Sequence, residues 1–316
     1  MRAVVIDQGE LHVIERSDPA PPAGWALVDV AAAGLNAADL LQRRGNYPAP
    51  AGWPADVPGM EFSGTVLAVG SASDEAYVGR RVCGIVGGGA QATRLVAPVA
   101  HLITLPDEVS LLDAGAFAEA FLTAHDALVT QARLSVSERL LVSGASGGVG
   151  NAAVQIARLR GAHVTAVTRH DAHAVALTAL GAHEVISLDE VAGIDPVDVV
   201  LELVGAAHLG LAQRRLAPFA RVVVIGVSGG GASVELNLLN VMSARASITG
   251  STLRARSEEE KARVTDAAAR ELLAPLAAGA LKVPLAATFA LDEVRAAYDY
   301  FAQPGKFGKV ALTMAS

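Results

Sequence analysis

Short runs of alternating or β-branched apolar residues, separated by Gly and Pro, fill the first part of the chain. The strand-like runs are Ala3–Ile6, His12–Ile14, Ala26–Val30, Gly64–Val69, Arg81–Ile85 and Ala92–Val96. Gly and Pro gather between them, at Pro19–Gly24, Pro48–Pro58 and Gly87–Gly89. Alternating runs that end at such residues are typical of short β-strands. The pattern therefore predicts an irregular, barrel-like β domain.

From about Ser110 the spacing of the apolar residues changes. Residues 111–132 have helical spacing, and strand-like runs then alternate with helical ones, at Leu140–Val142, Val164–Val167, Val185–Ile186, Val199–Leu203 and Arg221–Ile225. This alternation is typical of a parallel sheet with crossover helices. After about Leu285 the first pattern returns. We therefore predict an α/β fold in which residues 120–262 form a doubly wound domain, and residues 1–119 and 263–316 form the β domain.

Composition and charge narrow the class of protein. A chain of 316 residues, 52% of them hydrophobic, is long enough to bury two separate cores. Its net charge of −7 at pH 7 offers no basic surface, so we expect no nucleic-acid partner. No apolar run is long enough to cross a bilayer, and the N-terminus lacks the apolar core of a secretory signal. Cys83 is the only cysteine, which excludes an intrachain disulfide and a multi-cysteine zinc site. We expect a cytoplasmic protein.

The segment Gly144–Gly150 carries the strongest chemical signal. It lies between the apolar run Leu140–Val142 and a helix-like segment that begins at Asn151. A glycine turn between a strand and a helix presents free backbone N–H groups to a phosphate. In such a turn Gly147 lets the backbone approach a diphosphate, and Gly150 lets the helix pack against the strand. The predicted dinucleotide-binding residues are Ala145, Ser146, Gly147, Gly148, Val149 and Gly150.

The end of the next strand indicates which dinucleotide binds. Proteins that bind NAD usually carry an acidic residue there, which holds the ribose 2′-hydroxyl. This chain has Thr168 and Arg169 instead, and a guanidinium is suited to a 2′-phosphate. We therefore predict NADPH as the cofactor and interpret the nearby Asp171 as a helix N-cap. The alternative is that Arg169 is a solvated surface residue.

The same glycine turn also fits the nucleophile elbow of an α/β-hydrolase, with Ser146 as the nucleophile. That reading requires an acid followed by a histidine, and Asp198 and His208 occur in that order. Two features count against it. More than a hundred residues follow His208, and Gly150 has no function in an elbow.

Motifs along the whole chain carry a family resemblance. They are Gly34–Asp39, Arg43–Pro48, Pro58–Gly64, Gly87–Ala92, Glu119–Ala124, the glycine turn and Gly305–Val310. Through them the chain resembles the zinc-free quinone oxidoreductases of the medium-chain dehydrogenase/reductase superfamily, the group that includes zeta-crystallin. Asn36–Tyr47 and Ser251–Arg256 are most similar to the p53-inducible quinone reductases.

The resemblance implies a GroES-like catalytic domain, a Rossmann cofactor domain and an active site in the cleft between them. Zinc-dependent relatives have Cys and His where this chain has Asn36 and Met60, so we expect no metal, and we expect a structural role for Glu61. The resemblance also implies a homodimer joined through the Rossmann sheets. Ser233–Leu239 and Ala246–Thr249 are the candidate edge strands.

The resemblance further implies site residues. Tyr47 would donate a hydrogen bond to the acceptor oxygen, and Asn36 would bind substrate or the nicotinamide ribose, although Tyr47 could equally be a packing residue. Expected cofactor contacts, besides the glycine turn, are Thr123, Thr168, Arg169, Gly226, Val227, Ser228, Ser251, Leu253, Phe307 and Lys309. Gly226, Val227 and Ser228 follow a strand, at the edge of the sheet where cofactors bind. Arg254 and Arg256 fit either a place near the cofactor or a place on the surface.

These inferences converge on an NADPH-dependent reductase of quinones or other conjugated carbonyls. Such acceptors are already electrophilic and can take up hydride without a Lewis acid, unlike the alcohols that zinc acidifies. One alternative is an enoyl-thioester reductase of the same superfamily. Another is a non-enzymatic NADPH-binding protein, as zeta-crystallin-like chains can serve structural or RNA-associated roles.

Overall fold

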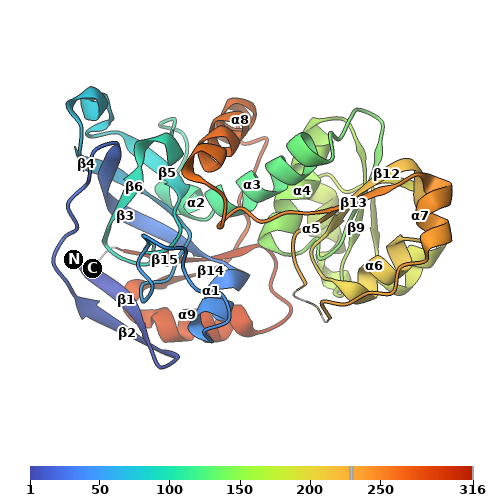
Figure 1. Cartoon of the computed structure of the whole chain (residues 1–316), viewed down its shortest axis with the longest axis horizontal. Helices are drawn as coiled ribbons and strands as arrows, with labels where there is room; N and C mark the ends of the chain where they lie inside the picture. The colour runs from blue at the N-terminus through green and yellow to red at the C-terminus, as the bar shows by residue number, and fades with distance from the viewer. Residues whose placement is uncertain (228, 230, 315–316) are drawn as a thin grey trace. The chain divides into compact units, whose positions relative to one another are not determined.

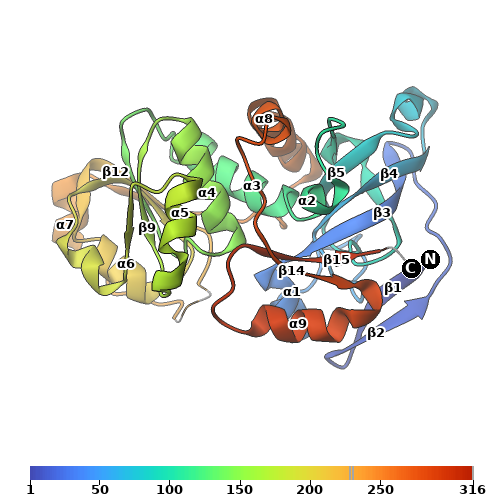
Figure 2. The same cartoon turned by 180° about the vertical axis from the view of Figure 1, so that it is seen from behind.

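The computed structural model describes residues 1–227, 229 and 231–314. The chain forms two compact units: a first unit of Met1–Leu122 with Leu253–Ser316, and a second unit of Thr123–Thr252. Both chain ends therefore belong to the first unit, as the blue and red segments show (Figures 1 and 2). The return to the first unit, at Leu253, comes earlier in the chain than the predicted residue 263.

The first unit is built on a largely antiparallel seven-stranded sheet. Its strands follow the order β14-β15-β3-β4-β5-β7, and β6 also pairs with β3. Their bounds are β3 (Trp25–Leu35), β4 (Glu61–Val69), β5 (Arg81–Ile85), β6 (Arg94–Pro98), β7 (Leu102–Thr104), β14 (Leu285–Ala290) and β15 (Lys309–Thr313). A separate hairpin joins β1 (Arg2–Asp7) to β2 (Glu10–Glu15). The long strand β3 has β4, β6 and β15 as partners, and register shifts interrupt its pairing with β4, as expected where a sheet curls.

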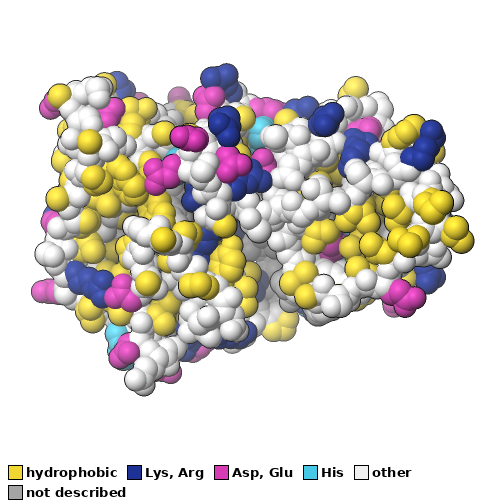
Figure 3. Space-filling model, viewed as in Figure 1, with side chains coloured by type: hydrophobic (Ala, Val, Ile, Leu, Met, Phe, Trp, Pro, Cys, Tyr) yellow, Lys and Arg dark blue, Asp and Glu magenta, His cyan; other side chains and the backbone are white. Residues whose placement is uncertain are grey.

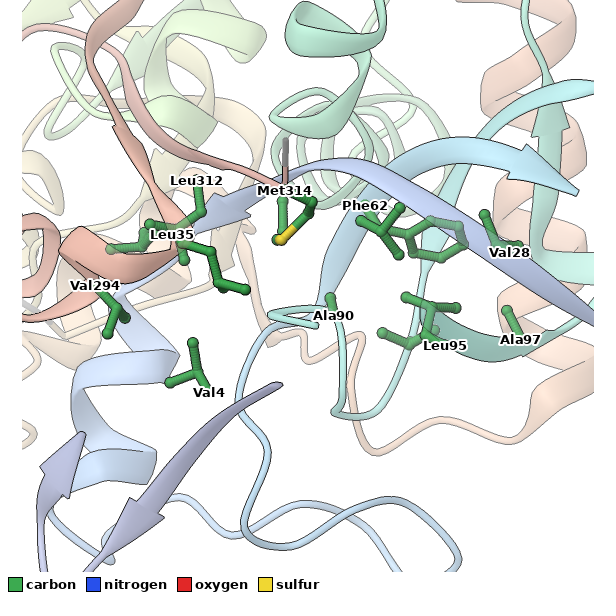
Figure 4. Packing of buried hydrophobic residues seen from close by; sticks show 14 of the residues in the cluster. Val4, Val28, Leu35, Phe62, Ala90, Leu95, Ala97, Val294, Leu312 and Met314 are labelled. Carbon is green, nitrogen blue, oxygen red and sulfur yellow. The ribbon is translucent and has the colours of Figure 1, made fainter. Parts of the chain in front are cut away.

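Alternating apolar positions on these strands bury one contiguous core. Leu35, Phe62 and Leu312 come from three neighbouring strands and lie in this core, which is completely shielded from solvent at all three positions (Figure 4). Helix α9 (Val294–Ala302) adds Val294 and Tyr298. The buried Tyr298 hydroxyl donates to Gln91 Oε1 at 2.9 Å, so its polar end is satisfied. The other helices of this unit are α1 (Ala37–Arg43), α2 (Leu111–Gly115) and α8 (Glu258–Ala277).

The second unit is a parallel six-stranded sheet in the order β10-β9-β8-β11-β12-β13. Numbered along the chain, this is the 3-2-1-4-5-6 order of the Rossmann fold, so the predicted doubly wound class is confirmed. The strands are β8 (Arg139–Val142), β9 (His163–Val167), β10 (Glu184–Ile186), β11 (Val197–Glu202), β12 (Leu216–Val224) and β13 (Ser247–Gly250). Its helices are α4 (Gly148–Leu159), α5 (Ala174–Leu180), α6 (Ala206–Ala212) and α7 (Leu238–Ala244). Among the described residues, no helix is both long and apolar enough to cross a membrane.

Two expected elements differ from the sequence reading. Residues 111–132 form α2, then α3 (Ala118–His125), then a π-helical turn at Asp126–Gln131, rather than one helix. The break follows Gly115, which is pressed so closely against β3 that an added Cβ would lie 2.6 Å from the Ala32 Cβ. Of the two candidate edge strands, β13 covers Ser247–Gly250, whereas Ser233–Leu239 is irregular up to the start of α7.

Candidate functional site

The glycine turn of the second unit has the geometry of a phosphate site. Gly147 is the N-cap of α4 and has no side chain to accept the first helical N–H groups. Within the described residues, the amides of Gly148, Val149 and Gly150 have no hydrogen-bond acceptor. Four N–H groups at a helix start normally need such acceptors, and an anion supplies them. The turn therefore fits the diphosphate of a dinucleotide.

Gly147 and Gly150 meet different constraints in this turn. A Cβ on Gly150 would lie 2.5 Å from the Gly144 carbonyl oxygen and 2.6 Å from the Ala145 Cα. Helix α4 can therefore pack on the turn only because residue 150 has no side chain. A Cβ on Gly147 would meet no described protein atom closer than 3.5 Å. Nothing in the described part of the chain requires glycine at 147, which is consistent with a requirement imposed by a ligand.

The end of β9 places polar groups beside this turn. Ser146 Oγ lies 2.8 Å from Thr168 Oγ1 and 2.9 Å from His173 Nδ1. Arg169 follows Thr168 and is exposed, and its guanidinium has no polar partner in the described part of the chain. The interpretation of Asp171 as an N-cap is wrong, because a 3₁₀ turn covers Asp171–His173 and its N-cap is His170. A free guanidinium thus lies one residue from the Ser146–Thr168 contact.

Other predicted cofactor residues of the second unit follow its strands at the same sheet edge. Gly226 and Val227 follow β12, and Ser251 follows β13, where its hydroxyl accepts a hydrogen bond from Gln131 Nε2 at 2.7 Å. Ser228 lies outside the described residues. Thr123 lies on α3 and is half-buried. Leu253, Phe307 and Lys309 belong to the first unit.

The structure does not bring the hydrolase residues together. His208 is buried with its Nδ1 against the Glu202 carboxylate, which also accepts hydrogen bonds from Ser143 Oγ and the Val204 amide, each at 2.8 Å. Asp198 accepts a hydrogen bond from the Arg139 amide at 2.8 Å. His208 and Asp198 therefore hold loops and strands in place. The histidine that contacts Ser146 is His173.

In the first unit, a buried ion pair organises the predicted substrate residues. Lys309 Nζ lies 2.6 Å from Glu61 Oε1, 2.6 Å from Asn36 Oδ1 and 2.8 Å from the Leu35 carbonyl oxygen. Asn36 Nδ2 in turn donates to Glu61 Oε1 at 2.9 Å. The three N–H donors of the ammonium are all used. Glu61 thus has the structural role expected for it, and contacts of Asn36 with substrate and of Lys309 with cofactor remain predictions.

Asp39 fixes the start of α1 beneath this pair. Its carboxylate accepts the Asn36 amide at 2.8 Å and the Gly59 amide at 3.2 Å. The first bond belongs to a capping box at the helix N-terminus. Burial raises the pKa of Asp39 to about 6, although these hydrogen bonds and the charges of Lys309 and Arg254 oppose the shift.

Arg254 ties helix α1 to the loop that follows it and to the loop at Gly87. Its guanidinium donates to the Gly87 carbonyl at 2.8 Å, the Tyr47 carbonyl at 3.1 Å and Gln42 Oε1 at 2.7 Å. It also lies 5.1 Å from the centroid of the Tyr47 ring. The side chain is buried, so it is no surface charge. Its partners are 167 to 212 residues away in the sequence, and no local pattern marks such a residue.

Glu119 and Lys261 are functional candidates that sequence reasoning did not single out. The Glu119 amide donates to Glu61 Oε2 at 2.9 Å, whereas its half-buried carboxyl group has no hydrogen-bond partner among the described residues. Burial and then the negative charge of Glu61 raise the pKa of Glu119 to about 8, against the opposing charges of Lys309 and Arg254. Lys261 is only 4% exposed, and burial lowers its pKa.

Among the described residues, no three His, Cys, Asp or Glu side chains converge to hold a metal ion. Met60 is buried, and Asn36 is engaged as described above. Burial raises the pKa of the Cys83 thiol far above its usual range, so this residue is an inert core thiol.

Comparison with known proteins identifies the family. Residues 22–131 match the alcohol dehydrogenase GroES-like domain, and residues 148–270 match the zinc-binding dehydrogenase domain. The human quinone oxidoreductase is 30% identical over 99% of this chain and 98% of its own length. The chain belongs to the medium-chain dehydrogenase/reductase superfamily. It is an oxidoreductase of that superfamily, with a GroES-like and a Rossmann domain.

Two further proteins that are similar to this chain differ from each other in function. The quinone oxidoreductase of Thermus thermophilus, whose complex with NADPH has been solved, is 30% identical over 99% of this chain and all of its own, with a TM-score of 0.86. A phenolphthiocerol/phthiocerol polyketide synthase of Mycobacterium tuberculosis is 31% identical over 98% of this chain. This chain spans only 14% of that synthase's length.

Proposed function

We propose that this oxidoreductase transfers hydride from NADPH to quinones or other conjugated carbonyls without a metal. The observation that carries the proposal is the open N-terminus of α4, beside the unpaired Arg169, in a chain that matches quinone oxidoreductases over almost its whole length. Asn36 and Met60 offer an amide and a thioether where zinc would need a thiolate and an imidazole, which supports zinc independence.

In this proposal, residues of the second unit bind the cofactor and residues of the first unit bind the acceptor. The amides of Gly148, Val149 and Gly150 would bind the diphosphate, and Arg169 would bind the 2′-phosphate. Bound NADPH supplies the hydride. In the first unit, burial raises the pKa of Tyr47, so its phenol stays protonated at neutral pH and can donate a hydrogen bond to the acceptor oxygen. Arg254 holds the Tyr47 backbone and faces its ring, which fixes the position of the phenol.

The function is tested by following NADPH oxidation by the purified protein, with a naphthoquinone and with a crotonyl thioester as acceptors. We expect faster turnover with the quinone, unchanged by a chelator. Faster turnover with the thioester would favour an enoyl-thioester reductase, the alternative that the likeness to a polyketide synthase segment supports. Tight NADPH binding without oxidation by either acceptor would favour a non-enzymatic NADPH-binding protein. Loss of activity with a chelator and its return with zinc would overturn the metal-free mechanism.

Arg169 is expected to set the preference for NADPH. Replacing it by glutamine removes a charge-assisted contact with the 2′-phosphate, worth about 1.5–3 kcal/mol, or roughly 10- to 100-fold in affinity. Fluorescence titration should show weaker NADPH binding and unchanged NADH binding. Arg214→Gln is the matched control, because Arg214 is also exposed in the second unit. An equal loss of affinity for NADPH and NADH, or no loss of affinity for either, would contradict the assignment.

We also propose a homodimer that pairs the β13 edges of two second units. β13 ends the sheet order, and its four residues are all exposed. The nearby helix α7 leaves Leu238, Leu239 and Met242 68%, 70% and 69% exposed, and Figure 3 shows hydrophobic side chains gathered over it. Apolar surface beside a free strand edge favours a partner.

The proposed dimer is tested by light scattering during size-exclusion chromatography. Replacing Leu239 and Met242 together by aspartate should convert a dimer into a monomer. The matched control is Val175→Asp on α5, since Val175 is 83% exposed and lies away from β13. A wild-type protein that is monomeric at micromolar concentration would refute the proposal.

A further inference from the structure

Three polar side chains of the first unit end without a hydrogen-bond partner in the described part of the chain. They are the Glu119 carboxyl group, the Lys261 ammonium group and the Tyr47 hydroxyl group. They lie in one electrostatic neighbourhood, since the charge of Glu119 raises the pKa values of both Tyr47 and Lys261. Arg254 affects the pKa values of all three, in each case downward. Their polar ends are not among the buried atoms that lack a partner and so reach solvent, where a small molecule that displaces this water can contact them.

Glu119 is held rigidly in this group. Its amide donates to Glu61 Oε2, and Glu61 is fixed by Lys309 and Asn36 through its other oxygen. The backbone of residue 119 is thus tied to a buried ion pair, while its carboxyl group is left for other contacts. The side chain is half-buried rather than enclosed, so that a small molecule and water can reach it.

Glu119 is also in the protonation state that donation requires. The charged groups that face it are Glu61 and Asp39, which raise its pKa, and Lys309 and Arg254, which lower it. The charge of Glu119 acts in turn on Lys261 and Tyr47. With burial as the largest effect, the pKa of about 8 keeps the carboxyl group protonated at neutral pH. General acids work best when their pKa lies close to the operating pH.

We propose that the carboxyl group of Glu119 donates the proton that completes the reduction of a conjugated carbonyl bound beside Tyr47. This inference rests on the proposed function and adds a catalytic residue to it. Tyr47 then orients the acceptor oxygen by a hydrogen bond, because a phenol whose pKa is raised gives up its proton less readily than this carboxyl group.

The step balances as a two-electron reduction. Hydride adds to the acceptor, and an electron pair moves onto the acceptor oxygen. The O–H bond of Glu119 breaks as the product O–H bond forms, which gives a hydroquinone from a quinone or an enol from an enone. The resulting Glu119 carboxylate is stabilised by the positive charges of Lys261, Lys309 and Arg254. Water then returns the proton, because the side chain is partly exposed.

The test compares Glu119→Gln with wild type in single-turnover NADPH oxidation, with a naphthoquinone and with an α,β-unsaturated aldehyde. We expect the rate constant to fall by about 100-fold or more, as for loss of a general acid. The wild-type rate should decline above about pH 8, where Glu119 ionises, and the variant should lack this decline. Glu119→Asp should keep the decline at a reduced rate, since it keeps a carboxyl group. The matched control Glu259→Gln, exposed on α8, should behave as wild type.

NADPH affinity and melting temperature serve as checks on the folded state. NADPH affinity and melting temperature should both be close to wild type in Glu119→Gln, because the N–H group that donates to Glu61 belongs to the backbone of residue 119 and is unchanged. A variant that keeps the wild-type rate and the alkaline decline overturns the role of Glu119 alone. If Glu119→Gln does not fold, a missing alkaline decline in both wild type and Glu119→Asp overturns it. If the wild-type protein fails to oxidise NADPH with every conjugated carbonyl that is tested, the proposed function is overturned as well.

Discussion

Gly150→Ala is expected to destabilise the second unit severely. The new Cβ would lie 2.5 Å from the Gly144 carbonyl oxygen, 2.6 Å from the Ala145 Cα and 2.8 Å from the Ala145 carbonyl carbon. All three are backbone atoms, so no side chain can rotate away, and α4 must move off the turn. Overpacking of this kind costs about 3 kcal/mol or more. In a domain of this size that loss lowers the melting temperature by roughly 6–12 °C, measurable by calorimetry.

Gly147→Ala provides the contrasting control in the same turn. Its Cβ would have 3.5 Å of clearance from the nearest protein atom, so the loss of stability should stay within about 1 kcal/mol, the usual cost of alanine at an N-cap. NADPH affinity should nevertheless fall about tenfold or more, because the backbone approach that the diphosphate needs is blocked. Equal destabilisation by both variants, or full NADPH affinity in Gly147→Ala, would refute this division of roles.

Lys309→Met is expected to have the second large effect, in the first unit. Glu61 is completely buried, and Lys309 is the cation beside its carboxylate, at 2.6 Å. Removing one member of a buried ion pair leaves an uncompensated charge and costs about 3–5 kcal/mol. Chemical denaturation should report this loss as a lower transition midpoint with an unchanged slope.

A double-mutant cycle separates the charge from the packing. Adding Glu61→Gln to Lys309→Met removes the stranded carboxylate and should restore part of the lost stability. Lys306→Met is the control, since Lys306 donates a hydrogen bond to the Gln303 carbonyl and lies over the Phe301 ring without a buried ion pair, so that its removal costs little. A cost below about 1 kcal/mol for Lys309→Met would show that the pair contributes little. A double variant Glu61→Gln, Lys309→Met that is less stable than Lys309→Met alone would show the same.

The parts of the fold that depend on neighbouring residues could be predicted from sequence. The runs Leu140–Val142 and Val164–Val167 lie within β8 and β9, because apolar runs bounded by turn residues are a local signal. The glycine turn could be predicted equally well, since its strand, glycines and helix are contiguous in the sequence. The interruption of the helix expected at 111–132 was not, because it depends on the close approach of Gly115 to Ala32 on β3.

The substrate-side residues required the tertiary structure. Tyr47 and Asn36 were proposed from resemblance, but the groups that hold them are far away in the chain. Lys309 contacts Asn36 across 273 residues, and Arg254 contacts Tyr47 across 207. The chemistry expected of Glu119 arises from charges that the fold brings to it, and its position in a motif gave no sign of them.

The pairing of β15 with β3 has a consequence for biosynthesis. Residues 310–313 hydrogen-bond with residues 32–35, although the whole second unit lies between them in the sequence. On a translating ribosome, β6 can already pair with residues 25–29 of β3, but residues 32–35 on that side of β3 have no neighbouring strand until β15 has emerged. The nascent chain has by then made everything that the second unit needs to fold, so an exposed β-edge accompanies this protein through most of its synthesis.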